Sequence, residues 1–418
     1  MKYFFPDSQD LVDPSFDFTT ERRSKDRIRQ RDDEYAHEVF KTRAFDGLLV
    51  SKGIVDGYGG SSSRYTPGQR HRLLRLGAPE FFRVNSRKPP LPIMGDCGAF
   101  TYVKEKEPPY TVDELLDFYD NCQFNLGLSL DHVILQYQPE WDETKVRAGG
   151  VPAEIHERLA LTIKLAREFF KKHKAGRFRF VPIGVAQGWS PKSYTNSVRD
   201  LQKIGFKYIA LGGMVPLKTP EILECLRAVE DVLKPGTRLH LLGITRPEHV
   251  AEFARYGVAS FDSTSPLRQA FKDDRDNYYT LSRTYTAIRI PQVEGNPSLQ
   301  KMVQSGRVAQ ELARAQERRC LDAMRDFEAG RLSVVSTIEI LREYEHLYDP
   351  KADHADAYRE TLESTPWRNC SCDICTRLGY HVILFRGAER NRRRGFHNVW
   401  TFFRRMRQEL GIELVEAA

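Results

Sequence analysis

Eight short apolar runs, separated by longer segments with helix-like patterns, constrain the fold of this chain more than any other feature. Each run has the length of one buried strand, and several of the segments between them carry helix start signals, such as the capping box of Thr111 and Glu114. Buried strands that alternate with helices predict a parallel sheet, open or closed, and eight strands are the number that closes a (β/α)8 barrel. The runs occupy residues 2–5, 47–51, 91–95, 126–130, 178–186, 207–213, 239–244 and 258–261.

Two stretches fall outside this alternation. Residues 16–45 are charged and are predicted to be helical, and residues 298–348 have the pattern of long helices. We therefore expect a barrel over residues 1–297, a helical insertion over 298–348 and a further subdomain with a closing helix over 349–418.

Composition limits the class of protein. The 418 residues are 40% hydrophobic and 29% charged, which is enough to bury a large core. No run of about 18 apolar residues occurs, which argues against a membrane span. The first residues lack the long apolar region of a signal peptide, so we expect a cytoplasmic protein. The formal net charge of +7 permits a polyanionic partner without requiring one.

Three of the seven cysteines, Cys370, Cys372 and Cys375, lie close together in the stretch CSCDIC. An odd number of cysteines without a secretion signal argues against structural disulfides and favours thiolates or metal ligands. The other cysteines are expected to be packing residues, namely Cys97, Cys122, Cys225 and Cys320.

Polar residues and glycines follow the predicted strands at the end where (β/α)8 barrels hold their chemistry. Each aspartate alone could be a turn residue or a helix cap, and a glycine pair could relieve a tight turn. Their recurrence at one topological position favours a site. The residues are Asp96, Asp131, Gln187, Gly212, Gly213 and Asp262.

The sequence resembles the tRNA-guanine transglycosylase superfamily, whose members exchange a guanine base for a 7-deazaguanine. Several motifs are similar to those of the archaeal enzymes, while the opening MKYFFPDSQDLVDPSFDF and the helical insertion resemble the DNA-modifying branch, the DpdA proteins. The motifs are GDCGAF (95–100), LDHVIL (130–135), GVAQG (184–188), ALGGMVPL (210–217), HLLGI (240–244), FDSTSP (261–266) and CSCDIC…FH (370–397).

The resemblance implies a role for each residue of the rim. Asp262 would be the nucleophile at C1′ of the sugar, and Asp96 would be the general acid and base. Phe100 and Leu242 would sandwich the base, although ordinary core packing is the alternative for both. The expected substrate-binding residues are Asp131, Gln187, Gly212, Gly213, Met214, Phe100 and Leu242.

The resemblance also implies a zinc site of three cysteines and a later histidine. His397, in RRRGFHNVW, is the expected fourth ligand beside Cys370, Cys372 and Cys375, and His381 is the competing candidate. A tetrahedral Cys3His site has no open position, so the Zn2+ would be structural and residues 349–418 would form a zinc-binding subdomain. Reduced free thiols are the alternative.

Two basic segments are candidates for nucleic-acid binding. Residues 385–407 contain eight arginines interleaved with aromatic residues, and Arg392, Arg393 and Arg394 are the expected contacts to nucleic acid. The alternative is a solvated helix face with its aromatic residues in the core. The run ERRSKDRIRQR, at residues 21–31, is a second and weaker candidate.

The resemblance, together with these features, implies a DNA-guanine transglycosylase that exchanges guanine in DNA for 7-cyano-7-deazaguanine through a covalent aspartyl-nucleotide intermediate. The alternatives are a tRNA-guanine transglycosylase of the archaeosine or queuosine type and a non-catalytic nucleic-acid-binding subunit. The presence of Asp96 and Asp262 argues against the subunit, and the absence of an RNA-binding extension after the zinc module favours DNA over tRNA. The expected partners are the nucleic acid, the free base and an ATPase or nuclease-like helper protein from a neighbouring gene, with a location at the nucleoid and no membrane.

Overall fold

The computed structural model describes residues 1–58, 64–86, 89–143, 150–272 and 275–412, which form two compact units. Among these residues, unit 1 comprises residues 1–9, 45–264 and 406–412, and unit 2 comprises residues 10–44 and 265–405. The units are interleaved in the sequence, whereas the predicted division at residues 297 and 348 was sequential. That division stays a prediction.

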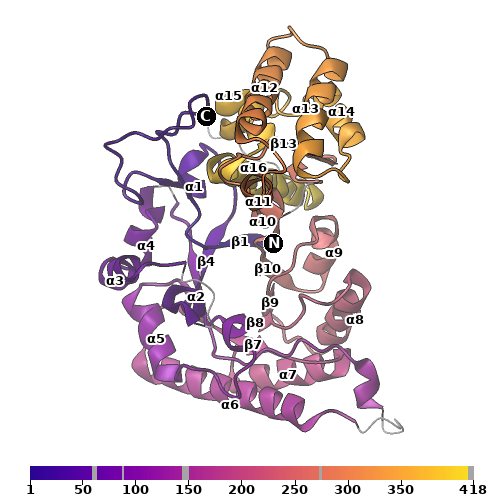
Figure 1. Ribbon diagram of the computed structural model, residues 1–418. Helices are drawn as coiled ribbons and strands as arrows, with labels where there is room; N and C mark the ends of the chain where they lie inside the picture. The colour runs from indigo at the N-terminus through magenta and orange to yellow at the C-terminus, as the bar shows by residue number, and fades with distance from the viewer. Residues whose placement is uncertain (59–63, 87–88, 144–149, 273–274, 413–418) are drawn as a thin grey trace. The chain divides into compact units, whose positions relative to one another are not determined.

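Unit 1 contains a closed barrel of eight parallel strands (Figure 1). The strand order is β1-β10-β9-β8-β7-β6-β5-β4, so the first strand closes the ring. Phe4 of β1 pairs with Asp262 on one side and with Gly47 on the other. This confirms the (β/α)8 barrel predicted from the eight apolar runs. The strands are β1 (Lys2–Pro6), β4 (Gly47–Ser51), β5 (Ile93–Asp96), β6 (Leu126–Leu128), β7 (Val181–Ala186), β8 (Tyr208–Leu211), β9 (Arg238–Leu241) and β10 (Val258–Asp262).

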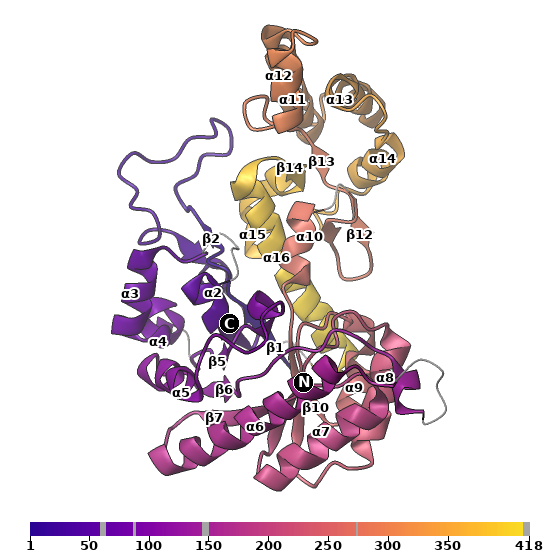
Figure 2. The same ribbon diagram turned by 60° about the horizontal axis from the view of Figure 1, so that its bottom comes forward.

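Helices cover the outside of the barrel, as Figures 1 and 2 show for α5 to α9. Thr111 caps α5 by accepting a hydrogen bond from the backbone N–H of Glu114, as the sequence predicted. Tyr119 of α5 packs so closely on β5 that a Cβ atom at Gly95 would lie 2.2 Å from its ring. The helices of unit 1 are α2 (Lys52–Asp56), α3 (Pro67–Leu76), α4 (Ala78–Phe81), α5 (Val112–Asn121), α6 (Ala153–Gly176), α7 (Pro191–Ile204), α8 (Thr219–Glu230) and α9 (Val250–Arg255).

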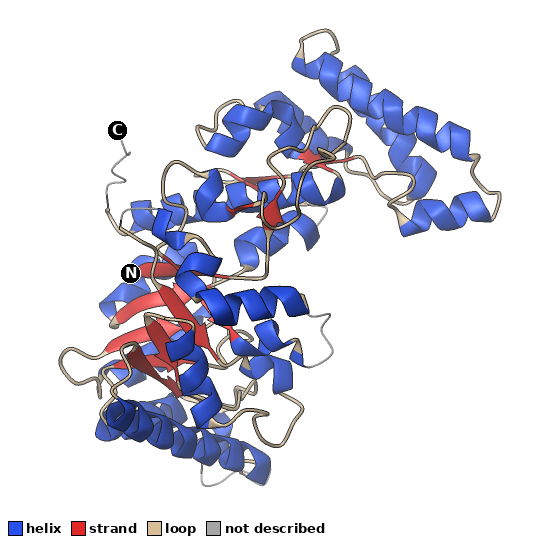
Figure 3. Ribbon diagram, turned by 90° about the vertical axis from the view of Figure 1, so that its left-hand side faces the viewer, coloured by secondary structure: helices blue, strands red, loops and turns tan. Residues whose placement is uncertain are grey.

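Unit 2 is mainly helical, with pairs of short strands, and its helices and strands can be followed by colour in Figure 3. Helices α12 and α13 pack against each other, and α13 packs against α14, which confirms the long helices predicted for residues 298–348. None of the helices among the described residues is long and apolar enough to span a membrane. The helices of unit 2 are α1 (Ala36–Val39), α10 (Ser265–Lys272), α11 (Pro297–Gln304), α12 (Gln310–Glu328), α13 (Val334–Tyr348), α14 (Ala355–Ser364), α15 (Asp373–Leu378) and α16 (Gly387–Glu409), whose last residues, from Met406, belong to unit 1. The strand pairs are β2 (Leu11–Val12) with β3 (Glu34–Tyr35), β11 (Tyr278–Tyr279) with β12 (Thr284–Tyr285), and β13 (Ile288–Arg289) with β14 (Leu384–Phe385).

The prediction that residues 16–45 are helical is wrong. Within this segment only Ala36–Val39 form a helix, and most of the remainder consists of turns and loops. Asp17 accepts hydrogen bonds from the backbone N–H groups of the two threonines that follow it, and Asp32 accepts one from Ile28. Such local bonds from aspartate side chains compete with the helical hydrogen bonds of the backbone.

Candidate active site

Three aspartates lie at or just beyond the C-terminal ends of barrel strands. Asp96 is the last residue of β5, Asp262 is the last residue of β10, and Asp131 follows β6 by three positions. Because the strands are parallel, these ends open on the same rim of the barrel, which is where such barrels carry out their chemistry. The structure therefore brings together the carboxylates singled out in the sequence.

Asp96 has an environment that disfavours its charged form. Part of its surface remains accessible, but burial of the carboxyl group, together with the charges of Asp131 and Asp262, raises the pKa of Asp96 to about 7. One of its oxygens accepts a hydrogen bond from the backbone N–H of Gly98 at 3.0 Å. At neutral pH this carboxyl group therefore exists in both protonation states, as a group that alternates between acid and base requires.

Asp131 is buried, and donors hold both of its carboxylate oxygens. The thiol of Cys97 donates to Oδ1 at 3.0 Å, and the amide of Gln187 donates to Oδ2 at 2.7 Å. Burial raises the pKa of Asp131, and these two donors counteract the rise. Cys97 was expected only to pack, so its contact with Asp131 adds a role that sequence reasoning missed. Burial also raises the pKa of the Cys97 thiol, which keeps it a donor.

The glycine pair after β8 allows a close approach to Gln187. A Cβ atom at Gly212 would lie 2.3 Å from the Gln187 side chain, and one at Gly213 would lie 2.1 Å from the backbone oxygen of Ile134. Gly213 also has a φ of +73°, a conformation that favours glycine. Any larger residue here would displace the amide that holds Asp131. Met214, the next residue, is fully buried.

The two residues expected to sandwich the base differ in exposure. Phe100 lies in the 3-10 helix η3 (Ala99–Tyr102) and is 52% exposed, so its ring is available for stacking on a flat ligand. Leu242 is partly buried against the apolar core of the barrel. Their roles in binding a base stay predictions.

Asp262 is held at one oxygen by two groups of β9 and the turn after it. The backbone N–H of Gly243 donates to Oδ1 at 3.0 Å, and Nε2 of His240 lies 3.2 Å from the same oxygen. Sequence reasoning missed His240 because it treated residues 239–244 only as an apolar strand. A histidine inside that run was the available signal.

A second cluster lies in unit 2 and has the donor set of a metal centre. The sulfur atoms of Cys370, Cys372 and Cys375 and a nitrogen of His397 all lie within 4.8 Å of one another. Nδ1 of His397 is 3.7, 3.4 and 3.4 Å from the three sulfurs, in sequence order. These residues can therefore hold a metal ion with tetrahedral Cys3His coordination.

The surroundings of His397 select the nitrogen that faces the cysteines. Nε2 lies 2.7 Å from the backbone oxygen of Tyr279, so it carries the proton and leaves Nδ1 as the ligand atom. The ring of Tyr278 stacks on the imidazole at 4.2 Å, and its hydroxyl lies 3.1 Å from the Cys375 sulfur. His381, the competing candidate, is outside the cluster and stacks on Tyr380 instead.

The arginines of α16 do not form the exposed surface predicted from the sequence. Arg394 is 0% exposed, and its guanidinium donates to backbone carbonyl oxygens within unit 2. Arg393 is buried and pairs with Glu389, and Arg392 lies 3.6 Å from Asp10. The prediction that Arg393 and Arg394 contact nucleic acid is therefore wrong, because both are used inside the fold. Burial lowers the pKa of Arg394 to about 9.

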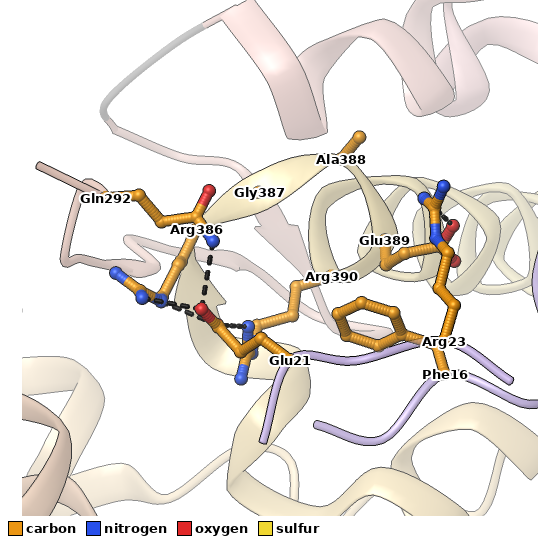
Figure 4. A pocket seen from close by; sticks show the side chains of 9 residues that line it. All are labelled: Phe16, Glu21, Arg23, Gln292, Arg386, Gly387, Ala388, Glu389 and Arg390. Atoms are coloured by element: carbon orange, nitrogen blue, oxygen red, sulfur yellow. Dashed lines mark hydrogen bonds and ion pairs between the residues drawn. The ribbon is translucent and has the colours of Figure 1, made fainter. Parts of the chain in front are cut away.

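Arg386, just before α16, and Arg390 of α16 instead hold the segment of residues 10–44 through ion pairs. Figure 4 shows Arg386 and Arg390 directed at Glu21, beside a cavity of about 380 Å3. Nε of Arg386 donates to Oε1 of Glu21 at 2.7 Å, and Nε2 of Gln292 donates to Oε2 of Glu21 at 2.9 Å. Burial acts to raise the pKa of Glu21, but the two arginines outweigh it and lower this pKa to about 2. The ion pairs of Glu21 with Arg386 and Arg390 therefore hold this segment in place.

Comparison with known proteins assigns this (β/α)8 barrel, with its rim carboxylates and Cys3His cluster, to a class of enzymes that act on nucleic acids. Residues 143–303 match the family described as Queuine tRNA-ribosyltransferase. A DNA-guanine transglycosylase of Salmonella montevideo is 48% identical over 417 residues, which cover 99% of this chain and 98% of that protein. A tRNA-guanine(15) transglycosylase of Methanosarcina barkeri is 26% identical over 46% of this chain and 37% of its own length.

The chain belongs to the tRNA-guanine transglycosylase superfamily, in its DNA-modifying branch. It is therefore an enzyme, a pentosyltransferase that acts on nucleic acid.

Proposed function

We propose that this enzyme exchanges guanine in DNA for 7-cyano-7-deazaguanine through a covalent aspartyl-nucleotide intermediate. The observation that best supports the exchange chemistry is that Asp96 and Asp262 lie on the same rim of the barrel. Asp96 has a pKa of about 7, and Asp262 accepts hydrogen bonds at one of its two oxygens. The full-length similarity to a DNA-guanine transglycosylase supports DNA as the substrate.

The exchange takes two displacements at C1′ of the nucleotide. In the first, a carboxylate oxygen of Asp262 forms a bond to C1′, the bond from C1′ to N9 of guanine breaks, and Asp96 gives a proton to the departing base. In the second, N9 of the incoming 7-deazaguanine attacks C1′, Asp96 takes the N9 proton, and the carboxylate of Asp262 leaves. Two inversions give net retention at C1′.

The buried amide and carboxylate of the rim suit a guanine-like ring. Asp131 can accept hydrogen bonds from N1–H and the exocyclic amine, because an ionised carboxylate offers only acceptors. Gln187 and the backbone N–H groups near Gly213 and Met214 would address O6 and the substituent at C7. The reacting base has to be flipped out of the base stack to reach this rim. The enzyme therefore also has to bind the phosphate backbone on either side of that base.

We further propose that the metal ion is Zn2+ and that its role is structural. Three thiolates and one imidazole nitrogen are the ligands that zinc prefers, and four protein ligands leave no position for a substrate. The ion would tie α15 to α16, since its ligands come from Cys372, Cys375 and His397 on or beside these helices.

The exposed loop at residues 21–31 is the better candidate for phosphate contacts, because Arg393 and Arg394 are buried and the other arginines of α16 are buried or only partly exposed. Arg22, Lys25 and Arg29 have exposed side chains in this loop. Their neighbour Arg27 pairs with Asp33 and Asp13, which holds the loop in shape. Exposed cations on an ordered loop bind phosphates without reading the base sequence.

Neutralising Arg22, Lys25 and Arg29 together is expected to weaken DNA binding and to lower its dependence on salt. Each lost phosphate contact should reduce the slope of log affinity against log salt by roughly one unit. The measurement is a binding titration at several salt concentrations.

A charge-matched control neutralises Lys171, Lys174 and Arg179, exposed residues on α6 and before the N-terminal end of β7, away from the rim. Equal losses of affinity in both triple variants would show a general effect of net charge and would rule out the loop as the phosphate surface.

The function is tested by offering labelled guanine or 7-cyano-7-deazaguanine with duplex DNA and with tRNA in parallel. Each reaction is run with and without the ATPase or nuclease-like protein expected from a neighbouring gene. We expect label in DNA and little or none in tRNA. Label in tRNA alone, with the helper present, would overturn this proposal and establish a tRNA-guanine transglycosylase instead.

A further inference from the structure

A chain of buried polar side chains lies inside the barrel, next to Asp262. Tyr208 of β8, His240 of β9 and Ser260 of β10 are all buried. The Tyr208 hydroxyl lies 2.5 Å from Oγ of Ser260, which lies 2.5 Å from Nδ1 of His240. Nε2 of His240 then lies 3.2 Å from Oδ1 of Asp262.

Packing alone does not explain these residues. Branched apolar side chains usually fill the interior of such barrels, and here Leu128, Ile183 and Val185 do so on the other strands. A buried polar group costs free energy unless it is hydrogen bonded, so three polar residues in one connected row indicate a specific use. His240 and Ser260 are paired in the register of β9 and β10, which brings these two side chains together.

The chemistry of Asp262 fixes the direction of the hydrogen bonds. An ionised carboxylate only accepts, so Nε2 of His240 must carry a proton and donate it to Oδ1. In a neutral imidazole Nδ1 then accepts, which requires the Ser260 hydroxyl to donate to it and the Tyr208 hydroxyl to donate to Ser260. Burial raises the pKa of Tyr208, which keeps that hydroxyl protonated. Every group in the row therefore donates towards Asp262.

We propose that His240 is a positioning residue for the nucleophile, and that Ser260 and Tyr208 fix its tautomer. Together with the N–H of Gly243, it holds Oδ1 of Asp262 and leaves Oδ2 as the atom that attacks C1′. When the Oδ2–C1′ bond forms, Oδ1 becomes the carbonyl oxygen of the ester. When that bond breaks in the second displacement, the carboxylate charge returns and both donors stabilise it. The inference rests on the proposed role of Asp262.

The test compares single-turnover rates of covalent-complex formation with DNA in the full-length protein. His240→Leu is expected to lower the rate by the order of 100-fold, as loss of one aimed donor does in other enzymes, with DNA affinity unchanged. His240→Gln should recover to within about tenfold of the wild-type rate, because its amide N–H can replace Nε2–H. The control is His249→Gln, a partly exposed histidine in the 3-10 helix η5 (Pro247–His249), which should match the wild type.

A second measurement does not depend on activity. The 15N spectrum of histidine-labelled protein, with His240→Gln to assign the signal, should show the Nε2–H tautomer for His240 in the wild type. Signal for the Nδ1–H tautomer would overturn the proposal, because Nε2 could not then donate to Asp262.

The kinetic outcomes separate this inference from the function on which it rests. A wild-type rate in folded His240→Leu would overturn the positioning role while leaving base exchange intact. Equal loss in His240→Leu and His240→Gln would also overturn it, since that result indicates packing alone. If the wild-type protein forms no covalent complex with DNA, the proposed function fails and the positioning role fails with it.

Discussion

Asp262→Ala is expected to abolish base exchange and to remove the covalent complex with DNA. The side chain supplies the atom that bonds to C1′, and neither Asp96 nor Asp131 can replace it without moving, because they lie at or beyond the ends of other strands. Loss of a nucleophile commonly reduces turnover by roughly four orders of magnitude or more. The measurement is exchange of labelled guanine, together with denaturing electrophoresis of the protein with DNA.

The fold should survive this change, since Asp262 lies at the end of its strand and not in the apolar core. Thermal unfolding close to that of the wild type would show this, and Asp231→Ala, at an exposed aspartate after α8, provides the matched control. Asp262→Asn is a poorer variant, because deamidation would restore the carboxylate. Full exchange activity in Asp262→Ala would remove this residue from the mechanism.

The barrel could be predicted because its signal is local. Each buried strand is a short apolar run, and several of the following helices have their own start signals, so eight repeats predict a parallel barrel without knowledge of any long-range contact. The rim aspartates could be located for the same reason, since each directly follows a run. Their roles came from the family resemblance and not from the pattern.

The buried arginines and the missed histidine both depend on partners that are distant in the sequence. The arginines of residues 385–407 are predicted to be exposed unless carboxylates elsewhere in the chain pair with them. Here Glu21, more than three hundred positions earlier in the sequence, pairs with Arg386 and Arg390. The absence of the predicted helix at residues 16–45 has a local cause instead, because aspartates of this segment accept hydrogen bonds from nearby backbone N–H groups. His240 was missed because only the barrel register brings it to Ser260 and Asp262.

Removing one ligand of the Cys3His cluster is expected to have the largest effect on stability. The wild-type protein should contain about one zinc ion per chain, and Cys372→Ser should lose it and unfold at a lower temperature. A structural metal site contributes its binding free energy directly to folding, so the loss should be several kcal/mol, roughly 3 or more. Metal analysis and calorimetry of the same samples measure both quantities.

The matched pair His397→Ala and His381→Ala tests which histidine completes the site. His397 alone faces the three sulfurs, and its Nε2 is already bonded to Tyr279, so His397→Ala should behave like Cys372→Ser. His381 stacks on Tyr380 outside the cluster, so His381→Ala should keep its zinc and its unfolding temperature apart from a small packing loss. Zinc retained in His397→Ala and lost in His381→Ala would reverse the ligand assignment. Zinc absent from the wild-type protein would leave the cluster as reduced thiols, and stability would then not respond to a chelator.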